Sequence, residues 1–298
     1  MTDASNAPAW FRRAIAEPAE SRAISVEGAR IHYLRWGATR RPGIVFVHGG
    51  AAHAHWWSFI APLFLPLYRV AAIDLSGHGD SERRADYPRE LWAREVMAVA
   101  DDAGFDGPPI VVGHSMGGFV TIATAAEFGH RLAGAVVLDS PVRRPDPEEE
   151  EGARGKAFRH PKVYPDVATA LEHFRTVPDQ PSSLPYVLDH VARHSLVEVA
   201  DGWTWRFDPV IFRRSTPRAT REMLADVKCR VALFRAEYGL VTPDIGSHMF
   251  ELLGRNAPVI EIPEAYHHIM LDQPLSLVTG LRTLLADWEH SVPRSRRG

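Results

Sequence analysis

The segment 113–117, Gly-His-Ser-Met-Gly, carries the clearest chemical meaning in this sequence. An apolar run, residues 109–112, leads into it, and residues 119–128 behind it suit a helix. A serine between a strand and a helix, with glycines two positions before and after it, is typical of a nucleophile elbow. This turn is sharp and strained, and larger side chains at the glycine positions would block it. The pattern predicts that the Ser115 hydroxyl stands free at the edge of a sheet.

His267 is the candidate base for this serine. A serine hydroxyl is a poor nucleophile at neutral pH and needs an adjacent general base. His267 follows the last expected strand, residues 259–262, and a helix begins soon after it near Pro274. It is therefore expected on a loop at the carboxyl edge of the sheet. Its neighbour His268 is the alternative, and we favour His267 for its offset before the segment 272–274, Asp-Gln-Pro.

The elements that must position these residues alternate between strands and helices. Strands are expected at 23–26, 30–36, 43–47, 68–75, 110–113, 132–138, 230–236 and 259–262, and helices at 10–16, 56–65, 91–103, 119–128 and 275–288. Several strands are apolar throughout, as in strands buried on both faces of a parallel sheet. Such alternation favours a doubly wound, mostly parallel α/β fold, in which ligands bind beyond the carboxyl ends of the strands. Polar residues end or follow five of the expected strands, which argues for a site on that edge: His48, Asp74, Ser115, Asp139 and Glu237.

Composition divides the chain into three parts. Residues 1–20 are expected to form an N-terminal arm with a short amphipathic helix, and residues 21–140 with 221–298 the α/β core. Residues 141–220, which begin with prolines and an acidic run, are expected to form a helical cap inserted between two core strands. The candidate substrate-lining residues are aromatic: Trp57 from the core, and Phe158, Trp203 and Trp205 from the cap.

The bulk composition limits the partners of the chain. A formal net charge of −3 gives no overall field that would attract nucleic acid or an anionic membrane. Cys229 is the single cysteine, which excludes an intramolecular disulfide, and residues 1–20 lack an apolar signal core. No stretch of the sequence is long enough to span a membrane. We expect a cytoplasmic enzyme, a monomer or a homodimer, that acts on a small molecule.

The sequence gives little evidence for a metal site or a phosphate-binding loop. His53 and His55 form an H-x-H pair, as in some metal-dependent amidohydrolases, but no carboxylate at a suitable spacing completes a site. The segment 113–118 lacks the lysine of a phosphate-binding loop. We therefore expect no metal and no organic cofactor.

Taken together, these motifs resemble those of the α/β-hydrolase fold superfamily, in particular its lid-bearing serine esterases. The resemblance covers residues from about 23 to 290 and rests on four pieces: His48-Gly49-Gly50, Asp74-x-x-Gly77-x-Gly79-x-Ser81, the segment 113–117, and the His267 loop ending at Pro274. It implies an oxyanion hole of two backbone N–H groups that stabilise charge on the carbonyl oxygen. One N–H would come from Met116 and the other from Gly50, with Ala51 as the alternative.

The acid that orients His267 is where the sequence departs from the family. The family usually carries it just after the strand that ends here near residue 236, and Gly239 stands at that place. Two substitutes remain. Asp139 ends the preceding strand, a position that some family members use, and Glu237 sits slightly early on the usual strand. The acid must reach the outer nitrogen of the histidine to fix its tautomer. We favour Asp139 and keep Glu237 as the alternative.

The resemblance implies a serine hydrolase that cleaves a carboxylic ester of a small, apolar substrate through an acyl-enzyme. Lactones and C–C bonds are alternative targets of the same residues, because a fold does not fix a function. Related dehalogenases and epoxide hydrolases carry an aspartate at the nucleophile position, so Ser115 argues against both. A non-catalytic receptor for a small ligand is the alternative outside the enzymes.

Overall fold

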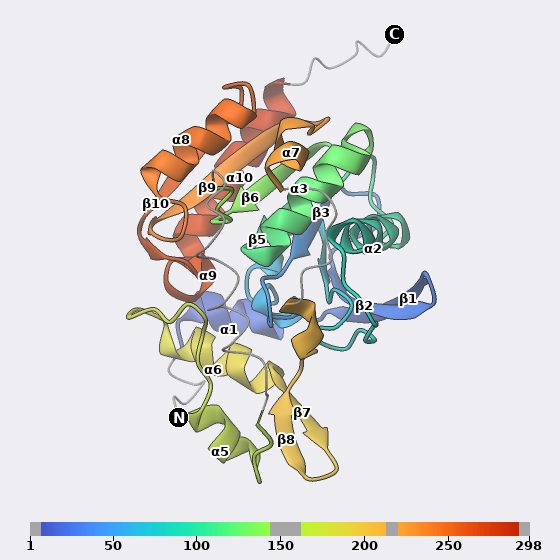
Figure 1. The fold of residues 1–298 in the computed structure, drawn as a ribbon, viewed down its shortest axis with the longest axis vertical. Helices are drawn as coiled ribbons and strands as arrows, with labels where there is room; N and C mark the ends of the chain where they lie inside the picture. The colour runs from blue at the N-terminus through green and yellow to red at the C-terminus, as the bar shows by residue number, and fades with distance from the viewer. Residues whose placement is uncertain (1–6, 144–161, 213–219, 292–298) are drawn as a thin grey trace.

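A mostly parallel β-sheet forms the centre of the molecule in the computed structural model, which describes residues 7–143, 162–212 and 220–291 (Figure 1). Within these ranges the sheet has eight strands, in the order β1-β2-β4-β3-β5-β6-β9-β10. The strands are β1 (Glu20–Val26), β2 (Ala29–Trp36), β3 (Gly43–Val47), β4 (Arg69–Ile73), β5 (Ile110–His114), β6 (Gly134–Leu138), β9 (Val231–Tyr238) and β10 (Val259–Tyr266). β1 and β2 pair antiparallel, β2 pairs antiparallel with β4, and the strands from β4 to β10 along this order run parallel. The predicted doubly wound α/β fold is confirmed.

Helices cover both faces of this sheet. One face packs against α2 (Arg89–Asp102), α3 (Met116–Phe128), α7 (Thr220–Ala225) and α8 (Pro243–Leu252). The other packs against α1 (Ala9–Ala16), the short 3-10 segment η3 (Ala61–Phe64), α9 (Ile269–Asp272) and α10 (Pro274–Ser291). The side chains of β3 alternate between the two cores: Ile44 and Phe46 face one, while Val45 and Val47 face the other. A strand buried on both sides has no polar face, which explains its uninterrupted apolar sequence.

The helix expected at residues 56–65 is wrong. The structure has two short 3-10 segments there, η2 (Ala54–Trp56) and η3, with Pro62 at the start of η3. Proline has no backbone N–H to donate, and its ring clashes with the carbonyl one turn earlier, so an α-helix cannot continue through this position. The apolar spacing of this stretch therefore reflects burial of a compact turn under the sheet and not one helical face.

Residues 162–212, which we call the inserted segment, lie between β6 and α7 in the sequence and form a separate layer. It contains α5 (Val167–Glu172), α6 (Pro185–His194), the strands β7 (Leu196–Val199) and β8 (Gly202–Trp205), and η5 (Pro209–Phe212). β7 and β8 form an antiparallel hairpin that the sequence pattern did not predict. The Leu184 N–H donates to the Leu271 carbonyl at 2.7 Å, which holds the start of α6 beside α9. Figure 1 shows this layer below the sheet, with α6 next to α1.

The predicted N-terminal helix is confirmed as α1, and it packs on the body of the protein. Phe11 is buried against Phe59 of the core and Tyr186 of α6, with ring centroids 5.7 and 4.8 Å away. α1 therefore joins the core to the inserted segment. No helix in the described ranges combines the length and the apolar character needed to cross a lipid bilayer.

Candidate active site

The polar residues singled out in the sequence gather where the parallel strands end. β3 pairs with β4 on one side and β5 on the other, so the chain changes direction across the sheet between β3 and β5. Ligands of open α/β sheets bind at such a switch point, outside the carboxyl ends of the strands. Ser115 directly follows β5, and the turn His48-Gly49-Gly50 directly follows β3, so both lie at this crevice.

Ser115 sits on a strained turn. Its backbone has φ 55° and ψ −119°, a conformation that residues other than glycine rarely adopt, and its N–H donates to the Leu138 carbonyl at 3.0 Å. A Cβ on Gly113 would lie 2.2 Å from the Gly117 carbonyl oxygen, and one on Gly117 would lie 2.4 Å from the His48 carbonyl oxygen. Both glycines are thus needed to close the turn.

Three predicted residues form one hydrogen-bonded chain. His267 Nε2 lies 2.9 Å from Ser115 Oγ, and His267 Nδ1 lies 2.7 Å from Asp139 Oδ2. Asp139 is fully buried and His267 nearly so, whereas Ser115 is partly exposed. A carboxylate at Nδ1 fixes the tautomer in which Nε2 carries the lone pair, so Nε2 can accept the serine proton. The geometry is therefore that of a nucleophile, a base and an orienting acid.

Backbone groups hold the Asp139 carboxylate in place. Asp139 has φ 45°, and its side chain accepts hydrogen bonds from the N–H groups of Leu240 and Val241 at 2.7 and 3.1 Å. Burial alone would raise the pKa of Asp139, but the hydrogen bonds from His267 and these N–H groups outweigh it and lower the pKa. The carboxylate is thus kept charged opposite His267.

The alternative acid, Glu237, lies elsewhere. Its Oε2 accepts a hydrogen bond from the Glu264 N–H at 2.8 Å, near the surface, and it does not contact His267. His268, the alternative base, is also turned away from the serine. Its Nε2 lies 3.1 Å from the Pro178 carbonyl oxygen, and its N–H donates to the Gln180 side chain at 2.9 Å. His268 therefore attaches the inserted segment to the loop that carries His267.

Two backbone N–H groups are available beside the serine. Met116 is the first residue of α3, where N–H groups have no partner within the helix. Gly50 lies next to it, because a Cβ on Gly50 would be 3.6 Å from Met116 Sδ. Within the described part of the chain neither N–H is hydrogen-bonded. The neighbouring Ala51 has φ 57°, so the turn after β3 is strained as well.

Asp74 supports the turn after β3 through hydrogen bonds, a role that was not predicted from the sequence. Its buried carboxylate accepts hydrogen bonds from the Ala54 N–H at 2.6 Å, the Asp80 N–H at 3.0 Å and the His32 ring at 2.7 Å. A Cβ on Gly79 would lie 2.2 Å from the Asp74 carboxyl carbon, so Gly79 leaves room for this side chain. Asp74 thus fixes the chain just after the Gly50 turn. The sequence signal for this role was the Asp74-to-Ser81 motif itself.

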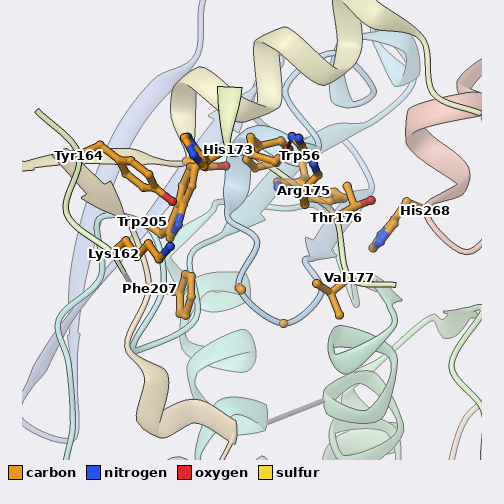
Figure 2. A pocket seen from close by; sticks show the side chains of 14 residues that line it. Trp56, Lys162, Tyr164, His173, Arg175, Thr176, Val177, Trp205, Phe207 and His268 are labelled. Carbon is orange, nitrogen blue, oxygen red and sulfur yellow. Dashed lines mark hydrogen bonds between the residues drawn. The ribbon is translucent and has the colours of Figure 1, made fainter. Parts of the chain in front are cut away.

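A cavity of about 280 Å³ opens beside these groups (Figure 2). Gly50 and Ala51 from the turn after β3, and His268 from the His267 loop, form its boundary with the site. The remaining lining is mostly from the inserted segment: Lys162, Tyr164, His173, Phe174, Arg175, Thr176, Val177, Ser195, Trp205 and Phe207, with Trp56 from η2. Figure 2 shows Tyr164, Trp205 and Phe207 on one side and Trp56, Val177 and His268 on the other. The aromatic rings make the walls largely apolar.

The predictions for substrate-lining residues need correction. Trp205 lines the cavity, but Trp57 is fully buried and stacks on Phe46 with ring centroids 4.7 Å apart. The 3-10 turn directs Trp56 to the cavity instead. Trp203 is outside the lining and bonds through its backbone to Tyr164. Phe158 lies outside the described residues.

Two cations in the lining were missed. Lys162 and Arg175 both line the cavity and are exposed, and the described lining contains no carboxylate. Among the described residues, Arg175 Nη1 donates to the backbone carbonyls of Glu172 and Phe174, at 2.9 and 2.6 Å, and to no carboxylate. Exposed cations in an irregular segment are common in any sequence, so no local signal distinguished these two.

Comparisons with known proteins agree on the fold. A model described as "Alpha/beta hydrolase family" matches residues 44–279. Lipase LipV of Mycobacterium tuberculosis is 36% identical over 112 residues, 38% of this chain and 42% of that protein, so the match spans less than half of its length. Esterase Rv0045c of the same organism is 26% identical over 269 residues, 87% of this chain and 88% of that protein. The crystal structure of E-2-(acetamidomethylene)succinate hydrolase superposes with a TM-score of 0.79 at 18% identity, covering 90% of this chain and 100% of that one.

Proposed function

The chain belongs to the alpha/beta hydrolase family, and from this premise we propose that it is a serine esterase that works through an acyl-enzyme. The main support for this proposal is a chain of two hydrogen bonds. Ser115 Oγ lies 2.9 Å from His267 Nε2, and His267 Nδ1 lies 2.7 Å from Asp139 Oδ2. The esterase and the lipase among its relatives support the ester as the bond attacked.

In the first half-reaction Ser115 Oγ attacks the ester carbonyl carbon while His267 Nε2 accepts its proton. Asp139 stabilises the imidazolium that forms. The carbonyl oxygen becomes an oxyanion that accepts hydrogen bonds from the N–H groups of Met116 and Gly50, each worth roughly 10²- to 10³-fold in turnover. The tetrahedral species then collapses, the C–O bond breaks, and His267 gives its proton to the departing alcohol.

In the second half-reaction water attacks the acyl-enzyme. His267 takes a proton from the water, and the same N–H groups hold the second oxyanion. The bond between Ser115 Oγ and the acyl carbon then breaks, His267 returns the proton to Ser115 Oγ, and the carboxylic acid leaves. The inserted segment acts in this account as a cap over the site, since it supplies most of the cavity lining.

The cavity favours a substrate that carries both an apolar part and an acidic group. The rings of Trp56, Tyr164 and Trp205 suit an apolar or aromatic group. Lys162 and Arg175, with no carboxylate beside them in the described lining, suit a carboxylate at the far end of the substrate. We therefore propose an amphipathic substrate, with an apolar part and a carboxylate, in place of the purely apolar one predicted from the sequence.

Hydrolysis of p-nitrophenyl esters tests the proposal. We expect wild-type turnover on p-nitrophenyl hexanoate, loss of activity to background in Ser115→Ala, and a fall of roughly 10⁴-fold in Asp139→Asn. Glu237→Gln is the matched control, because Glu237 bonds the Glu264 N–H and not His267. Wild-type turnover no faster than that of Ser115→Ala, or an equal loss in both acid variants, would contradict the proposed roles.

A further inference from the structure

Three histidines meet between the core and the inserted segment, away from the Ser115 site. His190 and His194 are four residues apart on α6, so they lie on one face of that helix, and His55 comes from η2 of the core. One ring nitrogen of each histidine lies within 4.8 Å of those of the other two. The His55 and His194 rings stack with centroids 3.9 Å apart, and the His190 and His194 centroids are 4.5 Å apart. All three side chains are partly accessible to solvent.

The hydrogen bonds around α6 leave a lone pair free on each of its two histidines. His194 Nδ1 lies 2.8 Å from the His190 carbonyl oxygen, so Nδ1 carries the proton and Nε2 is unprotonated. The Ser58 hydroxyl donates to the His55 carbonyl at 3.0 Å, so its oxygen accepts the proton of His190 Nε2 at 2.8 Å, and His190 Nδ1 is left free. Metal-binding histidines commonly donate their second N–H to such a carbonyl or hydroxyl oxygen.

The third histidine is equally available. Neither ring nitrogen of His55 has a hydrogen-bond partner among the described residues. The nearby cation, Arg206, is paired with Asp80 at 2.6 Å, which reduces its repulsion of an incoming ion.

We propose that His55, His190 and His194 bind a divalent transition-metal ion, Zn²⁺ in the first place, which clamps α6 to the core. Three histidines and a water make a common four-coordinate zinc set, and two histidines four residues apart on a helix supply two of its ligands. With Zn–N bonds of about 2.0–2.1 Å, tetrahedral ligand nitrogens lie roughly 3.4 Å apart. Because the His55 and His194 rings stack, their side chains must rotate before the three lone pairs converge on one ion. No carboxylate near in sequence completes a site with His53 and His55, but the fold brings His190 and His194 of α6 to His55.

The clamp has a consequence for the cavity. Ser195 follows His194 directly, lines the cavity, and bonds His53 Nε2 at 2.9 Å. An ion on His194 therefore fixes the end of α6 where the inserted segment borders the cavity. This inference does not depend on the proposed esterase activity, because it concerns metal binding and stability.

Calorimetric titration of the tag-free, EDTA-treated protein with Zn²⁺, together with absorption spectra of the Co²⁺ form, tests the site. We expect one ion per chain, a rise in Tm with Zn²⁺, and the intense visible bands of four-coordinate Co²⁺. His194→Gln and His55→Gln should each weaken binding at least tenfold. Ser58→Ala should weaken it less, because it removes the hydroxyl oxygen that accepts the His190 Nε2 proton. His130→Gln, which changes an exposed histidine outside the cluster, should bind as the wild type does.

Two results would overturn the proposed metal site, and neither can be explained by a variant that fails to fold. If the wild type itself shows no saturable binding, or Co²⁺ gives only weak six-coordinate bands, the site does not exist. Unchanged affinity in both folded cluster variants would place the ion elsewhere, for example on the buried group His114, His267 and His268, and would overturn the proposal.

Discussion

The carboxylate of Asp139 occupies the space that a side chain at Gly239 would need. A Cβ built on Gly239 would lie 2.4 and 2.5 Å from the two carboxylate oxygens. Gly239 follows β9 and Asp139 follows β6, and these two strands are neighbours in the sheet. The acid beside His267 thus follows β6. At the end of β9, where the resembling proteins usually carry the acid, Gly239 leaves space for the Asp139 carboxylate.

Exchanging the two residues tests this relationship. Asp139→Gly removes the acid at a position whose φ of 45° suits glycine, and should lower kcat/KM by about 10⁴-fold. Adding Gly239→Asp returns a carboxylate to the same space and should recover at least roughly tenfold of that loss. The measurement is steady-state hydrolysis of a p-nitrophenyl ester. A double variant no more active than Asp139→Gly would argue against the shared position.

The turn at Ser115 should be intolerant of a single methyl group. Gly117→Ala places a Cβ 2.4 Å from a backbone oxygen, which cannot move away cheaply, and should lower the free energy of unfolding by about 1–3 kcal/mol or more. Gly246→Ala in α8 is the matched control, because its nearest neighbour is 3.8 Å away. There alanine should be neutral or stabilise by up to about 1 kcal/mol. Equal urea midpoints for the two variants would refute the steric argument.

Asp272 should make the protein less stable as the pH rises. Burial raises its pKa to about 6. Between the ordinary value of 3.8 and 6 the folded state holds more protons than the unfolded state, so stability falls as pH rises through this window and stays lower above it. Asp272→Asn removes this loss and can still accept the Tyr266 N–H. We expect its gain in Tm over wild type to be larger at pH 8 than at pH 4.5. A gain independent of pH would show that the carboxylate is not the cause.

The two cavity cations should select for a carboxylate on the substrate. The probes are mono-p-nitrophenyl adipate and p-nitrophenyl hexanoate, which differ only in the terminal group. Arg175→Met and Lys162→Met should each raise KM for the adipate ester roughly three- to tenfold and leave the hexanoate ester unchanged. Arg221→Met, an exposed arginine on α7 outside the lining, serves as the control. A similar change in KM for both esters would mean that the two cations affect the shape of the cavity and do not bind the terminal carboxylate of the substrate.

The sequence was sufficient for the parts of the fold that local patterns determine. β3 was expected at residues 43–47 and spans these residues, because an apolar run between turn residues leaves few alternatives. The serine turn was readable because its glycines are a steric requirement. Failure came at residues 56–65, where buried apolar residues around Pro62 looked like one helical face. In the same stretch Trp57 was expected to line the substrate site, whereas Trp57 is buried and Trp56 lines the cavity.

Contacts between distant segments could not be predicted. Asp139 and Glu237 both end strands at the same edge, and only the placement of the strands shows which one faces His267. The spacing of His190 and His194 is visible in the sequence, but His55 lies far away along the chain. Lys162 and Arg175 could not be predicted as substrate-binding residues, because only the structure shows that they line one cavity.

Reaction with a fluorophosphonate probe tests whether Ser115 is an activated nucleophile, because the probe labels only a serine that its surroundings activate. Intact-protein mass spectrometry, followed by peptide mapping, would measure the adduct. We expect one adduct per chain, on Ser115, that is absent in Ser115→Ala and forms much more slowly in Asp139→Asn. A wild-type protein that stays unlabelled, or an adduct that persists in Ser115→Ala, would contradict the assignment of Ser115 as the nucleophile.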